Sequence, residues 1–210
     1  MTSGSTTASL KSEFVAFKTQ RIVEAATSLF YQRGYSSCTV EHVAEVLGVT
    51  KPFIYSYFKN KEAILAAICE VGVSEALGVL EETLDGSHRD YRQKLAAAVS
   101  QVGQIVIDRQ EHLVVYQREE KHLSEADATR LLRMRQSFDQ RIADLIRKGV
   151  ASGEFGEDVD PFVAVWIGGL ISWIPSWYSG KGKRSAQEVV DYLVQAALRL
   201  AGADSSADKV

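Results

Sequence analysis

The chain has 210 residues, of which 46% are hydrophobic, and a formal net charge of −3 at pH 7. This length and composition allow a substantial core in one or two domains, and the acidic balance excludes net charge as an argument for nucleic-acid binding. An acidic protein binds DNA only where its cations gather on one face, and residues 1–60 carry a net +2 against −5 for the remainder.

Residues 1–10 are rich in Ser and Thr and contain no apolar segment. We therefore expect a disordered arm there rather than a signal peptide. A helix is predicted next, because apolar residues recur at helical spacing and stop at Gly34, a residue suited to the left-handed position after a helix. These apolar residues are Ile22, Ala25, Ala26, Leu29 and Phe30.

Residues 39–61 predict two short helices joined by a glycine turn. In the first, Val40, Val43, Ala44 and Leu47 follow the i, i+3, i+4, i+7 spacing of one helix face. Thr39 is placed to cap its N-terminus. Gly48 ends it.

The second short helix is expected to begin at about Lys51, with Thr50 as its cap and Pro52 in its first turn, where a missing N–H costs nothing. Ile54 and Phe58 face inward by spacing. The outward side is suited to a major groove and its flanking phosphates. The outward residues are Lys51, Pro52, Phe53, Tyr55 and Tyr57, with Lys59 and Lys61 just beyond.

Downstream, helices are predicted over about 61–84, 88–109, 111–121 and 124–149, and the pattern contains no strand or repeat. The fold class is therefore all-α. We divide the chain into a DNA-binding helix-turn-helix domain at residues 1–60 and a larger helical domain at residues 61–203.

The stretch from 161 to 180 contains no charged residue before Lys181 and is close to the ~20 residues that a membrane crossing requires. Pro161 at its start, Pro175 near its end and interior Ser and Gly residues favour instead a helix of about four turns, buried all round by protein. Residues 185–200 predict another apolar helix, which Ser185 and Glu188 cap. Two such helices, near 161–177 and 185–200, predict a homodimer, because a monomer would expose too much apolar area.

The sequence contains no nucleophile elbow, phosphate-binding glycine loop or paired-cysteine zinc motif. Glu119 and His122 have the i, i+3 spacing of carboxylate-bridged metal sites, but such sites need several carboxylates from different helices. We expect this pair to lie on a solvated face, and we predict no catalytic residue, metal or cofactor. The cysteines Cys38 and Cys69 are too few for a disulfide framework and suit a reducing cytoplasm. Ordinary packing is a simpler explanation for both cysteines than a redox switch between them.

The run from Arg21 to Leu65, with Gly34-Tyr35, Leu47-Gly48-Val49 and the segment 54–61, resembles the DNA-binding domain of TetR-family transcriptional regulators. The resemblance implies that residues 61–203 form a ligand-binding and dimerisation domain. It implies that Thr39, Tyr57 and Lys61 contact phosphates. It also implies that Lys51, Pro52 and Tyr55 face the groove, and we count the cap Thr50 among the DNA-binding residues.

Two positions depart from the common family pattern. Phe53 is bulky where a small residue is usual, and Glu41 places an acid where a base-reading cation can occur. Glu can accept a hydrogen bond from cytosine N4, and an aromatic edge can pack on a thymine methyl group. Alternatively, Glu41 only stabilises the positive N-terminus of its own helix.

Residues 49–55, 116–124 and 173–182 further resemble the branch of the family that responds to acyl-CoA thioesters. That resemblance implies an apolar pocket with a phosphate-attracting rim. The candidate walls are Tyr116, Phe138, Trp173, Trp177 and Tyr178, and the candidate phosphate contacts are Arg118, Lys181, Lys183 and Arg184. Ordinary packing of the aromatics, and a soluble connector at 181–184, are the competing interpretations.

The sequence thus predicts a cytoplasmic, homodimeric repressor that releases a palindromic operator when it binds a small apolar effector. The alternative is an all-helical carrier or enzyme that retains a vestigial DNA-binding domain. A carrier would not need the groove surface between Lys51 and Lys61.

Overall fold

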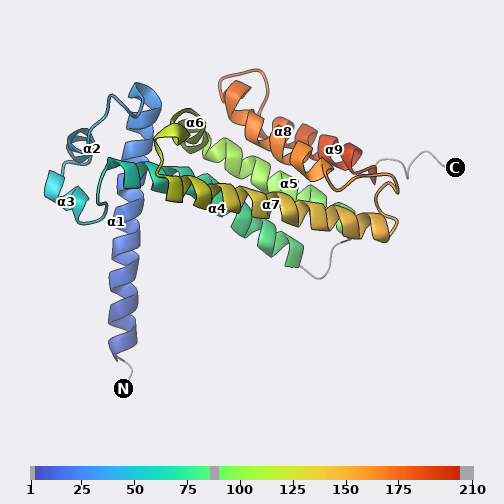
Figure 1. Ribbon diagram of the computed structural model, residues 1–210, viewed down its shortest axis with the longest axis horizontal. Coiled ribbons are helices and arrows are strands. Elements are labelled where there is room, and N and C mark those ends of the chain that lie inside the picture. Colours follow the sequence, from blue (N-terminus) through green and yellow to red (C-terminus); the bar gives the residue numbers. More distant parts are fainter. Residues whose placement is uncertain (1–2, 86–89, 204–210) are drawn as a thin grey trace. The chain divides into compact units, whose positions relative to one another are not determined.

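The computed structural model describes residues 3–85 and 90–203, with side chains from Ser12 onward. Every regular element in these residues is helical, which confirms the all-α prediction (Figure 1). The helices are α1 (Ser3–Arg33), α2 (Val40–Leu47), α3 (Lys51–Tyr55), α4 (Lys61–Asp85), α5 (Tyr91–Asp108), α6 (Gln110–Glu119), the short 3₁₀ turn η1 (Glu120–His122), α7 (Glu125–Ala151), α8 (Val163–Trp177) and α9 (Ala186–Leu200).

The chain forms two compact units. The first comprises Met1–Glu70 and Val114–Ala128, and the second comprises Val71–Leu113 and Thr129–Val210. This differs from the expected division at residue 60, because α4 runs on without a break and the segment Val114–Ala128 packs with the first unit. Sequence patterns predict where helices end. They do not predict the boundaries of the segment Val114–Ala128, because Val114 lies inside α6 and Ala128 lies inside α7.

The first helix is longer than expected. The arm expected at residues 1–10 is wrong from Ser3 onward, since α1 begins there; Met1 and Thr2 lie outside the described residues. Once a helix is nucleated, each further residue adds a hydrogen bond at little cost. The C-terminal half of α1 is anchored by Ile22 and Phe30, which are buried in the first unit.

The two short helices form as the spacing predicts. The Thr39 hydroxyl accepts a hydrogen bond from the backbone N–H of His42 at 3.3 Å, and the His42 side chain accepts one from Thr39 N–H. Gly48 ends α2 with a φ of +65°, in the left-handed region that favours glycine. Thr50 stands at the N-cap of α3, but it makes no side-chain capping bond. Val43 and Ile54 are fully buried, and α2 packs against both α1 and α3.

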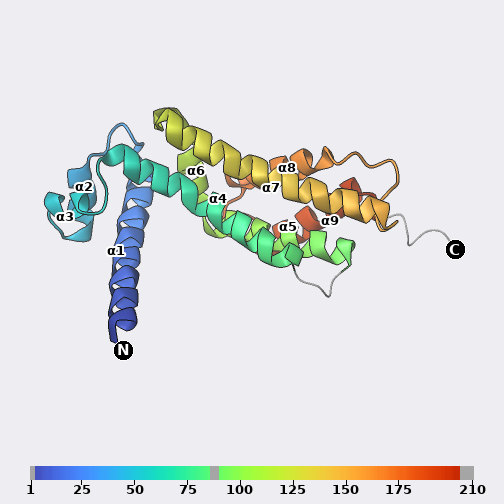
Figure 2. The same cartoon turned by 60° about the horizontal axis from the view of Figure 1, so that its bottom comes forward.

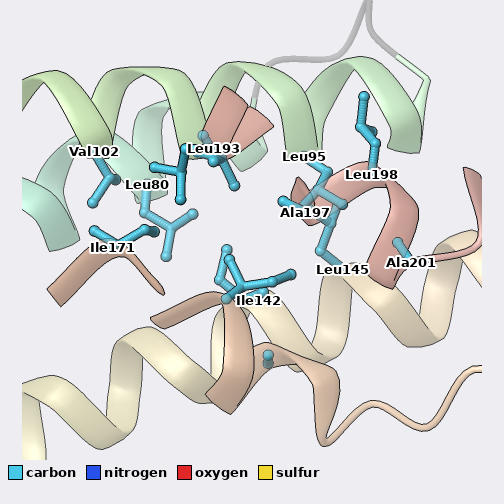
Figure 3. Close-up of a cluster of buried hydrophobic side chains, with 14 of the residues drawn as sticks. Leu80, Leu95, Val102, Ile142, Leu145, Ile171, Leu193, Ala197, Leu198 and Ala201 are labelled. Atoms are coloured by element: carbon cyan, nitrogen blue, oxygen red, sulfur yellow. The ribbon is translucent and has the colours of Figure 1, made fainter. Parts of the chain in front are cut away.

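In the second unit, α5 packs against both α8 and α9, which lie side by side (Figures 1 and 2). Aliphatic side chains from five helices fill the space between them. Gly149 near the end of α7 makes room for Phe155, because a Cβ atom there would lie 2.2 Å from the ring. Figure 3 labels core residues Leu80, Leu95, Val102, Ile142, Leu145, Ile171, Leu193, Ala197, Leu198 and Ala201.

Among the described helices, α4 is the one with enough length and apolar character to cross a membrane. Its apolar side chains have another explanation in the structure. Ile64, Leu65, Ile68 and Leu80 are fully buried against other protein atoms. The uncharged stretch that raised the same question in the sequence forms α8, which has 15 residues.

Candidate nucleic-acid interface and effector site

We define the recognition surface as the residues that the sequence assigned to DNA: Thr39, Glu41, Thr50, Lys51, Pro52, Phe53, Tyr55, Tyr57 and Lys61. The structure places all of them in the first unit, on α2, α3, the turns beside them and the start of α4. Lys51, Pro52 and Tyr55 are exposed, and Phe53, Tyr57 and Lys61 are half-buried. Their contacts with bases and phosphates stay predictions.

Glu41 and Lys51 form an ion pair across the α2–α3 turn. The hydrogen bond that the Lys51 ammonium donates to the Glu41 carboxylate holds the pKa of the Glu41 carboxyl below its usual value, and the same bond raises the pKa of the Lys51 ammonium. The Lys51 ammonium also lies 5.7 Å from the Tyr55 ring centroid. The sequence offered Glu41 as a base-reading acid or a helix N-terminal acid, and neither interpretation anticipated this pairing.

The bulky Phe53 takes part in a small aromatic group. Its ring centroid lies 5.2 Å from that of Tyr57, and the Lys18 ammonium lies over its ring at 5.8 Å. Lys18 belongs to α1 and was missed as a surface residue, because α1 was expected to contribute only an apolar brace. The positions of the charged residues before Ile22 do not indicate that Lys18 would contact Phe53.

Lys61 is held by the backbone between α1 and α2. Its ammonium donates hydrogen bonds to the carbonyl oxygens of Tyr35, at 2.9 Å, and Cys38, at 2.8 Å. It also lies 4.0 Å from the centroid of the Tyr35 ring. An ammonium has three N–H donors, so these two bonds fix its position and leave one donor for a phosphate.

Glu119 joins α6 to the same loop within the first unit. Its Oε1 accepts a hydrogen bond from Tyr35 N–H at 3.3 Å, and its Oε2 lies 3.6 Å from His122 Nε2. The Glu119 side chain is only 14% exposed, so the expectation of a solvated face is wrong for this residue. Burial raises the pKa of the Tyr35 phenol, with the carboxylates of Glu62 and Glu119 adding to the effect.

The candidate effector residues divide between the two units. Tyr116 is buried in the first unit, where the exposed Arg118 lies 5.8 Å over the Tyr31 ring. Phe138 is half-buried in the second unit and packs against its apolar core. Tyr178 is buried there too, and Gln110 Nε2 donates to its carbonyl oxygen at 2.7 Å.

Trp173 and Trp177 are not interior walls in this chain, since they are 65% and 55% exposed. They lie with other large apolar side chains on the outer side of α8, so the expectation that α8 is buried all round is wrong for the single chain. We call this surface the α8–α9 face. It comprises Phe162, Val165, Trp166, Leu170, Trp173, Trp177, Tyr192 and Leu200.

The cationic loop at 181–184 is exposed throughout. Arg184 pairs with Glu188 at 3.0 Å and lies 5.5 Å over the Tyr192 ring, so it supports the start of α9. Lys181 and Lys183 remain candidates for phosphate contacts. No group of three metal-ligating side chains occurs within the described ranges.

Comparison with known proteins places these features in a family. The family model described as "Bacterial regulatory proteins, tetR family" matches residues 22–68, and "Tetracyclin repressor-like, C-terminal domain" matches residues 88–201. The chain is 24% identical over 176 residues to the HTH-type transcriptional repressor KstR2 of Mycolicibacterium smegmatis, covering 83% of this chain and 85% of that repressor.

Solved structures share the fold. The TetR-family regulator PfmR from Thermus thermophilus superposes with a TM-score of 0.78 at 24% identity, covering 85% of this chain and 97% of PfmR. AibR, solved in complex with isovaleryl coenzyme A and operator DNA, gives a TM-score of 0.72 at 21% identity, covering 85% of this chain and 96% of AibR.

Proposed function

We propose, from the premise that this chain belongs to the TetR family of bacterial regulatory proteins, that it is a cytoplasmic, homodimeric transcriptional repressor. It binds a palindromic operator through two recognition surfaces and loses affinity when a small apolar effector binds. Relatives such as KstR2 are named transcriptional repressors. The chain's own support is the recognition surface, where α3 presents exposed Lys51, Pro52 and Tyr55 beside a short capped α2.

Homodimerisation is supported by the α8–α9 face. Trp166 and Trp173 are each more than 60% exposed, and α8 contains no charged residue. A contiguous apolar face of this kind marks an interaction site. A two-fold interface through it would supply two recognition surfaces, and such dimers read half-sites about one duplex turn, ~34 Å, apart or somewhat more.

An acyl-CoA thioester is the effector class that we propose. AibR was solved with isovaleryl coenzyme A, and three segments of this chain resemble acyl-CoA-responsive regulators. The exposure of Trp173 and Trp177 shifts the proposed apolar contacts to Phe138 and Tyr178 of the second unit, and Lys181 and Lys183 of the same unit are the proposed phosphate contacts.

A gel-shift titration tests the repressor proposal directly. The full-length protein is mixed with the DNA that flanks its own gene, and with a random duplex of equal length as the control. We expect the flanking DNA to bind about 10³-fold or more tightly than the random duplex at physiological salt. Equal binding to both duplexes would contradict the proposal.

A further inference from the structure

We propose that Glu41 acts as a specificity filter on the recognition surface. Its carboxylate forms an ion pair with the Lys51 ammonium, and this pairing weakens binding to DNA sites where Lys51 meets only phosphates. This inference rests on the proposed operator binding and names a determinant of its selectivity.

The ion pair joins two short helices whose positions are fixed independently. Glu41 lies in the first turn of α2, which the Thr39 cap starts, and Lys51 is the first residue of α3. Val43 and Ile54 are fully buried beneath them. Because buried residues and a cap hold both backbones, the carboxylate and the ammonium meet without DNA.

The pair is open to solvent, with 45% of the Lys51 side chain and 49% of the Glu41 side chain exposed. An exposed pair is readily broken, so it does not stop DNA from reaching Lys51. Its effect is on the net charge that a phosphate meets, which is zero for the pair and +1 for Lys51 alone. Fewer counterions are therefore released when the pair approaches a DNA backbone.

A correct base pair can satisfy both members at once. In the major groove a G·C pair presents the guanine N7 and O6 acceptors beside the cytosine N4 donor. The Lys51 ammonium donates to the first two, and the Glu41 carboxylate accepts from the third. Phosphates lack a donor for the carboxylate and repel it, so the pair penalises non-specific contact more than contact with such a site.

The test compares four variants of the full-length protein: Glu41→Gln, Lys51→Ala, the double variant, and Glu45→Gln as the matched control. Glu45 is an exposed carboxylate on the same helix, and no ion pair joins it to Lys51 in the described structure. Fluorescence anisotropy measures binding to the operator and to a random duplex over a series of salt concentrations. Circular dichroism checks that each variant is folded.

We expect Glu41→Gln to raise affinity for the random duplex roughly 3- to 10-fold and to steepen its log–log salt slope by about 0.9 per subunit. The ratio of operator to random affinity should fall. Glu45→Gln alone should have a smaller effect, and in the Lys51→Ala background Glu41→Gln should have no more effect than Glu45→Gln, because only the repulsion between one carboxylate and the phosphates is then removed.

Two results would overturn the filter. One is an equal gain from Glu41→Gln and Glu45→Gln, which would reduce the effect to overall charge. The other is a gain from Glu41→Gln that stays equally large without Lys51. A wild-type protein that does not prefer its operator would overturn the proposed function instead, and the random-duplex comparison would still decide whether Glu41 screens Lys51.

Discussion

At the scale of single residues, Lys61 makes structural contacts within the protein and is also the residue for which we propose a phosphate contact. Two carbonyl oxygens and the Tyr35 ring hold its ammonium at the start of α4. The family resemblance implied a phosphate contact at this position. The structure adds the internal contacts, which no sequence pattern could reveal because their acceptors are backbone atoms of a distant turn.

Replacing Lys61 with Ala should therefore have two separable effects. Loss of two charge-assisted hydrogen bonds from a half-buried site should lower the free energy of unfolding by about 1–2 kcal/mol. Loss of the third donor should lower the log–log salt slope of DNA binding by about 0.9 per subunit on every sequence. Lys59→Ala removes a neighbouring exposed lysine and is the control for unfolding.

Urea unfolding and salt-dependent anisotropy measure these two effects. Unchanged unfolding would show that the carbonyl contacts contribute little to stability. An unchanged salt slope would remove Lys61 from the phosphate contacts, and the internal role would stand alone.

At the scale of helices, local sequence signals predicted most helices and their caps. The main errors concerned which part of the protein each apolar helix face packs against. The Ser185 cap of α9 was readable because it depends on residues three apart, and the structure confirms it: Ser185 accepts from Glu188 N–H at 3.2 Å. The apolar face of the helix near 185–200 was expected to lie in a dimer interface, and this is wrong for part of that face. Val189 and Leu193 are buried in their own chain, because periodicity identifies an apolar face but not the surface that covers it.

The capping box of α9 should make part of the stability depend on pH. The backbone hydrogen bond from Ser185, followed by the bond from Arg184, keeps the pKa of Glu188 below its usual 4.5. A carboxyl with a depressed folded pKa stabilises the fold above its unfolded pKa and loses this contribution as pH falls through the folded value. Glu188→Gln should thus be less stable than wild type at pH 7, and the two should converge in acid.

Urea unfolding at pH 7 and near pH 3 checks this, with Ser185→Ala as the companion variant. Ser185→Ala should cost about 1 kcal/mol at pH 7. Part of this cost should remain near pH 3, because the bond from Glu188 N–H to the Ser185 hydroxyl is neutral, whereas the bond that this hydroxyl donates to the Glu188 carboxylate depends on pH. A Glu188→Gln difference that stays constant across the range would show that its carboxylate charge does not support the cap.

At the scale of the whole molecule, the all-α class and the helix-turn-helix followed from spacing and caps, whereas the assembly depends on a surface that one chain leaves uncovered. A partner's contacts do not appear in the periodicity of α8. Trp173 was assigned to an effector pocket for that reason, and its exposure now assigns it to the α8–α9 face.

The dimer is tested by placing a charge on that face. Trp173→Glu should give a folded monomer with weakened operator binding, because a carboxylate cannot be buried unpaired in an apolar interface. Leu132→Glu is the matched control, since Leu132 is a half-exposed apolar residue of α7 outside the face. Light scattering and gel shift measure assembly and binding. A dimeric Trp173→Glu variant with wild-type operator affinity would place the interface elsewhere.

The effector class is tested on the operator complex itself. A thioester must favour the non-binding state by a coupling of roughly 1–3 kcal/mol, which corresponds to a 5- to 150-fold loss of operator affinity at saturation. Free acid and free CoA should each do much less, because each supplies only one set of contacts. Replacing Lys181 and Lys183 with Ala, both exposed in the loop before α9, should weaken the response to thioesters and leave operator binding without effector unchanged.

Fluorescence anisotropy with a panel of acyl-CoAs, their free acids and CoA measures this release of the operator. If free acids release the operator as well as thioesters do, the CoA moiety is not recognised and only the apolar contacts remain.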